Sequence, residues 1–288
     1  MTNRREFLSA GAVAMAAEKS DRVTIAYRGR TLLEYRYGAD RPKTYIHPLC
    51  LPSGQPLTID GFKGHIHHRG LMVAWSEVNG VDFWGEDNPA RHGQIVHQRF
   101  ERLRERLPAE IVEINHWIAE GKLLLVERRT VRVPQPSAGS VWLDWTTELR
   151  AASGPVKLAA GPHVYDGLGI RFVPSMDGGD VVNANGSVTI EKANGEAARW
   201  CAYYGKIESA PGIAGVAMFD HPGNPRHPNA FFVMNKAFGY LSAAPTFRAP
   251  FDLALNQSIR FRWGVLAFAG EPQAEALDRR FQAWSKES

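Results

Sequence analysis

The stretch from residue 140 to residue 150, SVWLDWTTELR, restricts the fold more than any other part of the sequence. Apolar and polar positions alternate through it, so that residues 141, 143, 145 and 147 face one way and residues 142, 144, 146 and 148 face the other. Side chains of a β-strand point alternately to opposite faces, so this period of two predicts a strand. The chain is therefore expected to be built on sheets.

Most of the remaining chain has the same character. Short runs rich in β-branched and aromatic residues are separated by many of the 27 glycines and 18 prolines, and only residues 272–284 have a helical period. These features predict an all-β protein, namely a large antiparallel β-sandwich with one short C-terminal helix. A galactose-mutarotase-like supersandwich is one form of this class.

Two shorter segments and the domain boundaries complete the expected fold. Residues 64–70 are interpreted as a loop, and residues 189–192 as a strand. Because no repeat or composition break divides residues 18–288, they are expected to form a single domain.

The N-terminus has the features of an export signal. Residues 3–8, NRREFL, form a twin-arginine pattern, an apolar stretch follows, and residues 14–16, AMA, offer a small-residue cleavage site. Residues 1–17 are therefore interpreted as a Tat signal peptide, and the protein is expected in the periplasm or outside the cell. The alternative is an alanine-rich cytoplasmic terminus. No later segment has the about 20 apolar residues of a spanning helix, so no integral membrane segment is expected after signal removal.

Charge and motifs exclude several classes of function. The formal net charge is +4, but lysines and arginines are spread along the chain, so no nucleic-acid partner is expected. The sequence lacks a G-x-G-x-x-G pattern, a P-loop and a G-x-S-x-G elbow. Its two cysteines, Cys50 and Cys201, form no C-x-x-C pair, and whether they join in a disulfide stays open.

Polar and aromatic residues that are typical of an active site concentrate between residues 41 and 86. His65, His67 and His68 lie within four positions, and on an extended segment His65 and His67 share a face while His68 points away. Imidazoles act as acids or bases or bind metals, and the adjacent Arg69 can hold a carboxylate or a sugar hydroxyl. Glu86 follows two aromatic residues, which could raise its pKa as a general acid requires. The alternative is a loop whose histidines serve packing.

Two further polar groups lie in loops. Asp220, His221, Asn224 and Arg226 follow a predicted strand, and loops at strand ends commonly present site residues. The alternative is a well-capped turn.

The second group surrounds the sequence GLGIR. Tyr165 precedes two glycines and Arg171 follows them, and glycine permits close approach of a ligand. A glycine-rich hairpin with Arg171 on the surface is the alternative.

Several motifs resemble the family of uncharacterised bacterial domains named PmoA-like. They are RP with YIHPLCLPSG at residues 41–54, HHRGL at residues 67–71 and VNGVDFW at residues 78–84. HVYDGLGIR and FDHPGNPRHP, further along the chain, are similar to later blocks of the family. Met72 stands where the family tends to have tryptophan, and Val164 and Tyr165 separate His163 from the glycine motif.

The resemblance implies a β-sandwich, and a carbohydrate substrate, because related proteins occur in secreted sugar-catabolism systems. The family's name points to methane oxygenation, but the oxygenase subunit of that name is an integral membrane protein. The sequence therefore leads to three hypotheses from different classes.

The first hypothesis is an exported enzyme that acts on a sugar or glycoside by hydrolysis, elimination or isomerisation, through histidine and carboxylate acid–base chemistry. The second is an oxygenase or hydrolase that needs a divalent metal, and the third is a non-catalytic polysaccharide-binding module. A small-molecule or oligosaccharide substrate is expected, and no cofactor is assigned firmly. The expected catalytic residues are His67, His68, Glu86, Asp220 and His221. The expected substrate-binding residues are His47, Arg69, Trp84, Tyr165, Arg171, Asn224 and Arg226. The candidate metal ligands are His65, His67 and His163, with His221 as a substitute for the last.

Overall fold

The structure is a computed structural model that describes residues 21–62, 64–88, 91–137, 139–208 and 212–287. The expected signal peptide, residues 1–17, lies outside the described residues. No described helix is long and apolar enough to cross a membrane. Cys50 and Cys201 are both buried free thiols.

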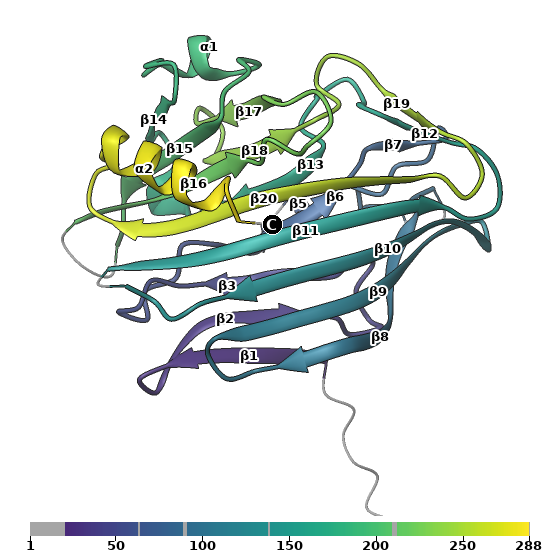
Figure 1. Cartoon of the computed structure of the whole chain (residues 1–288), viewed down its shortest axis with the longest axis horizontal. Helices are drawn as coiled ribbons and strands as arrows, with labels where there is room; N and C mark the ends of the chain where they lie inside the picture. Colours follow the sequence, from purple (N-terminus) through teal and green to yellow (C-terminus); the bar gives the residue numbers. More distant parts are fainter. Residues whose placement is uncertain (1–20, 63, 89–90, 138, 209–211, 288) are drawn as a thin grey trace, which may run out of the picture.

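Two large sheets make up most of the protein (Figure 1). The smaller has seven strands in the order β1-β2-β3-β6-β13-β18-β17, and every neighbouring pair is antiparallel. Its strands are β1 (Arg22–Tyr27), β2 (Arg30–Arg36), β3 (Tyr45–Leu49), β6 (Leu71–Ala74), β13 (Gly167–Arg171), β18 (Tyr240–Ala244) and β17 (Ala230–Met234).

The larger sheet has eight antiparallel strands in the order β14-β15-β16-β20-β11-β10-β9-β8. They are β14 (Asp180–Asn183), β15 (Trp200–Lys206), β16 (Ile213–Asp220), β20 (Ser258–Ala269), β11 (Ser140–Ala151), β10 (Lys122–Val133), β9 (Ala109–Ala119) and β8 (Gln94–Arg104). The alternating stretch that starts at Ser140 is the central strand β11, where Trp145 pairs with Trp263 of β20.

Apolar side chains pack on the inner face of this sheet and on part of its outer face. On the inner face, the ring of Trp117 in β9 contacts the rings of Trp75 and Phe83 at centroid distances of 6.0 and 5.1 Å. Trp75 and Phe83 follow β6 of the seven-stranded sheet in the sequence. On the outer face, helix α2 (Ala274–Trp284) buries Leu277 and Trp284 in a second, smaller apolar core (Figure 1). The prediction of an all-β sandwich with one short C-terminal helix is confirmed.

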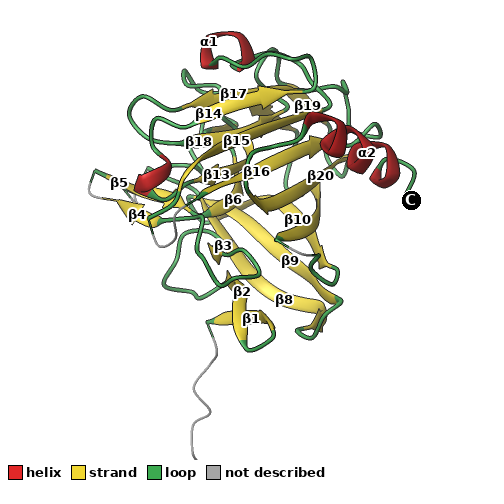
Figure 2. Ribbon diagram, turned by 90° about the vertical axis from the view of Figure 1, so that its left-hand side faces the viewer, coloured by secondary structure: helices red, strands yellow, loops and turns green. Residues whose placement is uncertain are grey.

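Two smaller sheets and two short helical segments complete the fold. The three-stranded sheet is β19 (Phe251–Leu253), β12 (Val156–Ala159) and β7 (Glu77–Val78), and the two-stranded sheet is β4 (Asp60–Phe62) and β5 (His65–Arg69). Figure 2 shows β4 and β5 at one side of the molecule, next to the seven-stranded sheet. The helical segments are a 3-10 turn (Pro174–Met176) and α1 (Ile190–Ala193).

Two expectations about local structure were wrong. Residues 189–192 belong to the start of α1 rather than to a strand, because glutamate, lysine and alanine are good helix formers. Residues 65–69 form strand β5 rather than a loop, because β4 pairs with them.

Candidate functional site

Strand β5 contains a bulge that changes the direction of its histidines. Asp60 pairs with Arg69 and Phe62 pairs with His65, so three residues of β5 lie opposite the single residue Gly61. Such a bulge interrupts the alternation of side chains and aims them in new directions. Gly61 has φ +71°, which is a conformation that side chains of L residues rarely adopt.

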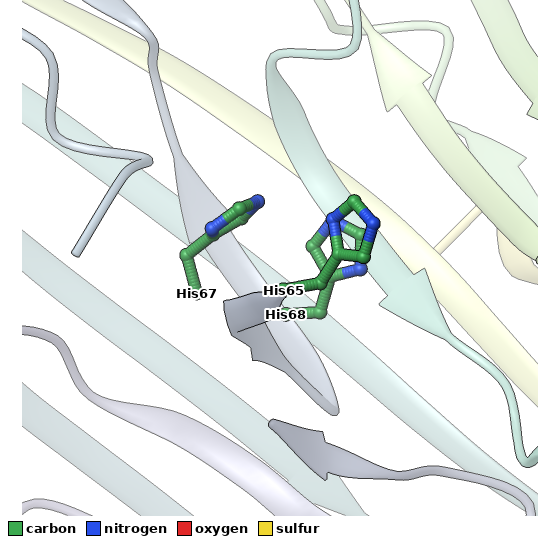
Figure 3. Close-up of side chains that lie close together, drawn as sticks. All are labelled: His65, His67 and His68. Atoms are coloured by element: carbon green, nitrogen blue, oxygen red, sulfur yellow. The ribbon is translucent and has the colours of Figure 1, made fainter. Parts of the chain in front are cut away.

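Because of the bulge, all three histidines of β5 converge (Figure 3). The ring centroids of His65 and His68 are 5.0 Å apart, and those of His67 and His68 are 4.6 Å apart. One ligand nitrogen from each histidine lies within 4.8 Å of the others. The expectation that His68 points away from His65 and His67 was therefore wrong, since it assumed an unbroken strand.

Burial keeps the inner two imidazoles neutral. Burial, together with the positive charge of Lys43, lowers the pKa of His67 from 6.5 to about 4. Burial and the neighbouring His67 lower the pKa of His68 to about 2. The His68 side chain is 5% exposed, and its Nδ1 atom has no hydrogen-bond partner. A buried ring nitrogen without a protein partner has its lone pair or its N–H group available to a ligand.

Aromatic rings surround this three-histidine cluster. Phe62, which is 47% exposed, stacks on His65 at 6.4 Å. Phe238 contacts His65 and His68 edge-on at 5.1 and 4.8 Å. Arg171 lies over Phe238 at 4.5 Å and donates hydrogen bonds to the carbonyls of Phe172 and Gly239. Arg171 is 2% exposed, so it is placed to support Phe238 rather than to reach a ligand from the surface.

Glu86 is held by the buried Lys43 and the half-buried Arg69 beside the cluster. Its Oε1 lies 2.9 Å from Lys43 Nζ, and its Oε2 lies 2.6 Å from Arg69 Nη2. Arg69 also pairs with Asp60 at 3.0 Å and thereby ties β5 to β4. Burial by itself would raise the pKa of Glu86, but Lys43 and Arg69 lower it below its ordinary value. The expectation of a raised pKa at Glu86 was wrong, because Lys43, which is distant in the sequence, lies against its carboxylate in the fold.

A pocket of about 290 Å³ adjoins this ion-pair network. Its walls include Arg41, Ile66, Arg69, Glu86 and His92. Ile66 is 47% exposed at the bulge of β5. The pocket therefore lies along the strand that holds the histidine cluster.

Three expected site residues lie in an aromatic group near the cluster. Trp84 is buried and contacts Tyr165 at 4.5 Å and Tyr240 at 5.8 Å. Tyr240 in turn contacts His68 at 5.9 Å. His163 is exposed and stacks on Tyr165 at 5.5 Å, outside the three-histidine cluster. His68, and not His163, is thus the third member of the group that could hold a metal.

His47 has a local structural partner. Its Nδ1 lies 3.1 Å from the Thr58 hydroxyl, and burial lowers its pKa. It belongs to β3, which contacts β5.

The loop after β16 has the contacts of a capped turn. Asp220 is fully buried and accepts hydrogen bonds from Asn224 Nδ2 at 2.7 Å, His227 Nδ1 at 2.8 Å and the Asn229 amide at 2.9 Å. His221 packs against Trp284 of α2.

The same loop is anchored at its far end. Arg226 donates to the carbonyls of Ala249 and Pro250 at 2.7 Å. No hydrogen bond, ion pair or ring contact between described residues joins this loop directly to the three-histidine cluster. Its geometry matches the alternative of a well-capped turn.

The sequence interpretation missed Lys43, Phe238 and Tyr240. Lys43 is 1% exposed and lies 43 residues before Glu86, without a recognisable motif, so only its proximity in space assigns it to the site. Tyr240 is the first residue of β18 and Phe238 lies just before that strand, far along the chain. Long-range packing of this kind leaves no periodic signal in a sequence.

Comparisons with known proteins give a family and two distant likenesses. The model of a family described as a family of unknown function, DUF6807, matches residues 22–282. No curated protein matches the chain.

Two of the solved structures that resemble the chain are much longer than it is. An α-galactosidase from Lactobacillus brevis is 11% identical, with a TM-score of 0.42, over 87% of this chain and 39% of that one. A protein described as a kojibiose phosphorylase, from the human microbiome, is 8% identical, with a TM-score of 0.38, over 93% of this chain and 33% of that one. The chain thus spans well under half of either protein, and likeness of this degree does not transfer an activity.

Proposed function

Since the chain belongs to DUF6807, a family of unknown function, we propose its function from its own site: His65, His67 and His68 bind a divalent transition-metal ion in an enzyme that acts on a sugar or glycoside. The observation behind this proposal is the convergence of three imidazole nitrogens within 4.8 Å. Imidazole is a preferred ligand of zinc, copper, iron and nickel.

The cluster needs only a small adjustment to bind an ion. Around a tetrahedral ion with bonds of about 2.1 Å, ligand nitrogens lie roughly 3.4 Å apart. Side-chain rotation of His65 and His67, both half-buried, would close the remaining gap. Three protein ligands leave one position open for water or substrate, as in catalytic zinc sites. A bound ion would polarise a substrate oxygen or lower the pKa of a bound water.

The metal reading is preferred to metal-free acid–base chemistry because of Glu86. The first hypothesis required a carboxyl group that keeps its proton, but Glu86 is ionised by its pairing with Lys43 and Arg69. Its role in the proposal is to hold Lys43 and Arg69 and so to fix β5 at its place beside the pocket.

A carbohydrate substrate is supported by the sequence and by the rings around the cluster. The twin-arginine pattern supports a location in the periplasm or outside the cell, and the motif resemblance to PmoA-like domains supports a role in sugar catabolism. Phe62 is exposed beside His65, and aromatic faces stack on the C–H groups of sugar rings. The reaction is hydrolysis, elimination or isomerisation of the sugar.

The proposal is tested by metal analysis of the mature protein purified without an affinity tag. We expect about one zinc, iron, manganese, nickel or copper ion per chain, and its loss in His67→Ala and His68→Ala proteins. His116→Ala is the matched control, because His116 lies on β9 outside the cluster and its loss should leave the metal in place. A folded wild-type protein that takes up no such metal, even after incubation with each ion, would refute the metal site.

Turnover is then tested on glycosides and keto-sugars. We expect activity that disappears with a chelator and returns with the metal. If the protein binds sugar without turnover, and the His68→Ala protein binds it equally well, the result would instead support a non-catalytic binding module.

A further inference from the structure

A chain of buried polar groups crosses the space between the two large sheets. Residues 39–41 separate it from the pocket of about 290 Å³ beside Glu86. The members of this polar chain come from β2, β9, β10 and β11 and from the segment before β3. They are Tyr35, Thr44, Glu113, Asn115, Glu127, Arg129 and Thr147, all 5% exposed or less. Buried charges are costly, so their arrangement calls for an explanation.

The inner end of this polar chain is neutral. Arg129 donates to both oxygens of Glu127, at 2.8 and 2.9 Å, and Trp117 Nε1 and the Thr147 hydroxyl complete the shell of donors around that carboxylate. The remaining Arg129 nitrogen, Nη1, donates to the Tyr35 hydroxyl at 2.9 Å. Each charge at this end therefore has its partners inside the protein.

The outer end is a second carboxylate that orients a histidine. Glu113 is fully buried and accepts hydrogen bonds from the Tyr35 hydroxyl and from Asn115 Nδ2 at 2.8 Å. Its other oxygen lies 2.5 Å from His97 Nδ1. A carboxylate fixes the tautomer and the orientation of a histidine that donates to it. No described residue makes a hydrogen bond or ion pair to His97 Nε2.

His97 forms part of the wall of a separate pocket of about 260 Å³. Tyr37 and Phe100 contact its ring at 4.7 and 4.5 Å and hold it against the pocket. The charged groups in the wall are paired: Asp40 lies 3.2 Å from Arg41, and Asp21 lies 3.7 Å from Arg22. The pocket therefore presents a fixed imidazole and an aromatic ring without an unpaired charge.

We propose that this pocket is a second ligand site, which binds a neutral, hydroxyl-bearing molecule of monosaccharide size through His97 Nε2. The walls that the ligand would meet are Tyr37, Asp40, Arg41, Thr44, Val96 and His97. Glu113 is the positioning residue, because it reaches the ligand only through His97. A neutral ligand fits a wall whose charges are paired, and a pocket smaller than about 300 Å³ suits a molecule below drug size.

The site does not depend on the metal. His97 makes no ring contact or hydrogen bond with the described residues of the three-histidine cluster. The two sites can consequently be tested separately in one protein.

The test follows the histidine ring nitrogens of the 15N-labelled full chain during titration with methyl β-glucoside and methyl β-galactoside. Glucuronate is the charged comparison. Signals are assigned with His97→Gln and His116→Gln, of which the second is the control because His116 lies on β9 outside this pocket. His67→Ala protein reports whether the response needs the metal cluster.

We expect saturable shifts of the His97 nitrogens with at least one neutral glycoside, unchanged in His67→Ala protein. His97→Gln should weaken binding about tenfold, as expected for the loss of one good hydrogen bond, and His116→Gln should not. Unshifted His97 signals up to the solubility limit of both glycosides would refute the site, whether or not the variant folds. Equal binding of glucuronate would refute the neutral ligand class, and a response lost in His67→Ala would assign the sugar to the metal cluster instead.

Discussion

Asp166 provides a measurable link between burial and pH. Its carboxyl group is fully buried and accepts hydrogen bonds from the amide and the hydroxyl of Ser76. Burial raises its pKa from 3.8 to about 7, and the Ser76 hydrogen bonds only partly oppose this. The folded protein therefore holds this proton more tightly than the unfolded chain does.

The sign and size of the effect follow from linkage. A raised pKa in the folded state contributes stability below the unfolded pKa, and that contribution is lost as the pH rises through the folded value. The interval from 3.8 to about 7 is worth on the order of 4 kcal/mol in total. Between pH 5 and pH 8, this one group should cost wild type roughly 3 kcal/mol of unfolding free energy.

The substitution that tests this is Asp166→Asn, which keeps the shape of the side chain and cannot ionise. We expect the stability of the variant, measured by urea denaturation and relative to wild type, to rise by roughly 3 kcal/mol from pH 5 to pH 8. Other titrating groups cancel in this comparison. Asp252→Asn is the control, because Asp252 is exposed on β19. If Asp166→Asn and wild type change in parallel over this range, the argument from burial is wrong.

Three shorter predictions concern the site and its support. Glu86→Gln should destabilise the protein by about 3–5 kcal/mol in urea, because it leaves the buried Lys43 and the half-buried Arg69 with a weaker partner. Gly169→Ala should cost about 1–3 kcal/mol and lower the Tm, because the new Cβ would overlap the Tyr240 hydroxyl; an unchanged Tm would contradict this packing. Asp220→Asn should lower stability while metal content stays as in wild type, whereas metal loss would connect that loop to the cluster.

The sequence predicted the class of fold because strand alternation is a local signal. β11 begins at Ser140 as expected, and α2 ends at Trp284 as expected, since both patterns repeat within a few residues. The short helix α1 was mistaken for a strand, because four residues contain too little periodicity to decide.

The grouping of the three histidines was predicted from the sequence, but its geometry was not. The histidines at 65, 67 and 68 stood out as a group in the sequence, yet a period of two could not anticipate the bulge opposite Gly61. The interpretation of Glu86 failed for a different reason, because its ionisation depends on Lys43, which reaches it through the fold. His97 and Glu113 were missed because each fits the ordinary alternation of its own strand, and nothing in that pattern links a residue of β8 to one of β9.

The placement of all three histidines on β5 also affects how much a bound metal could stabilise the fold. Because its three candidate ligands lie within positions 65–68 of one strand, most of the chelating power belongs to a short peptide segment. The unfolded chain keeps these imidazoles close together and retains part of its affinity for the ion. Since a ligand stabilises a protein only by its preference for the folded state, metal should raise the Tm less than its affinity for the folded protein alone would imply.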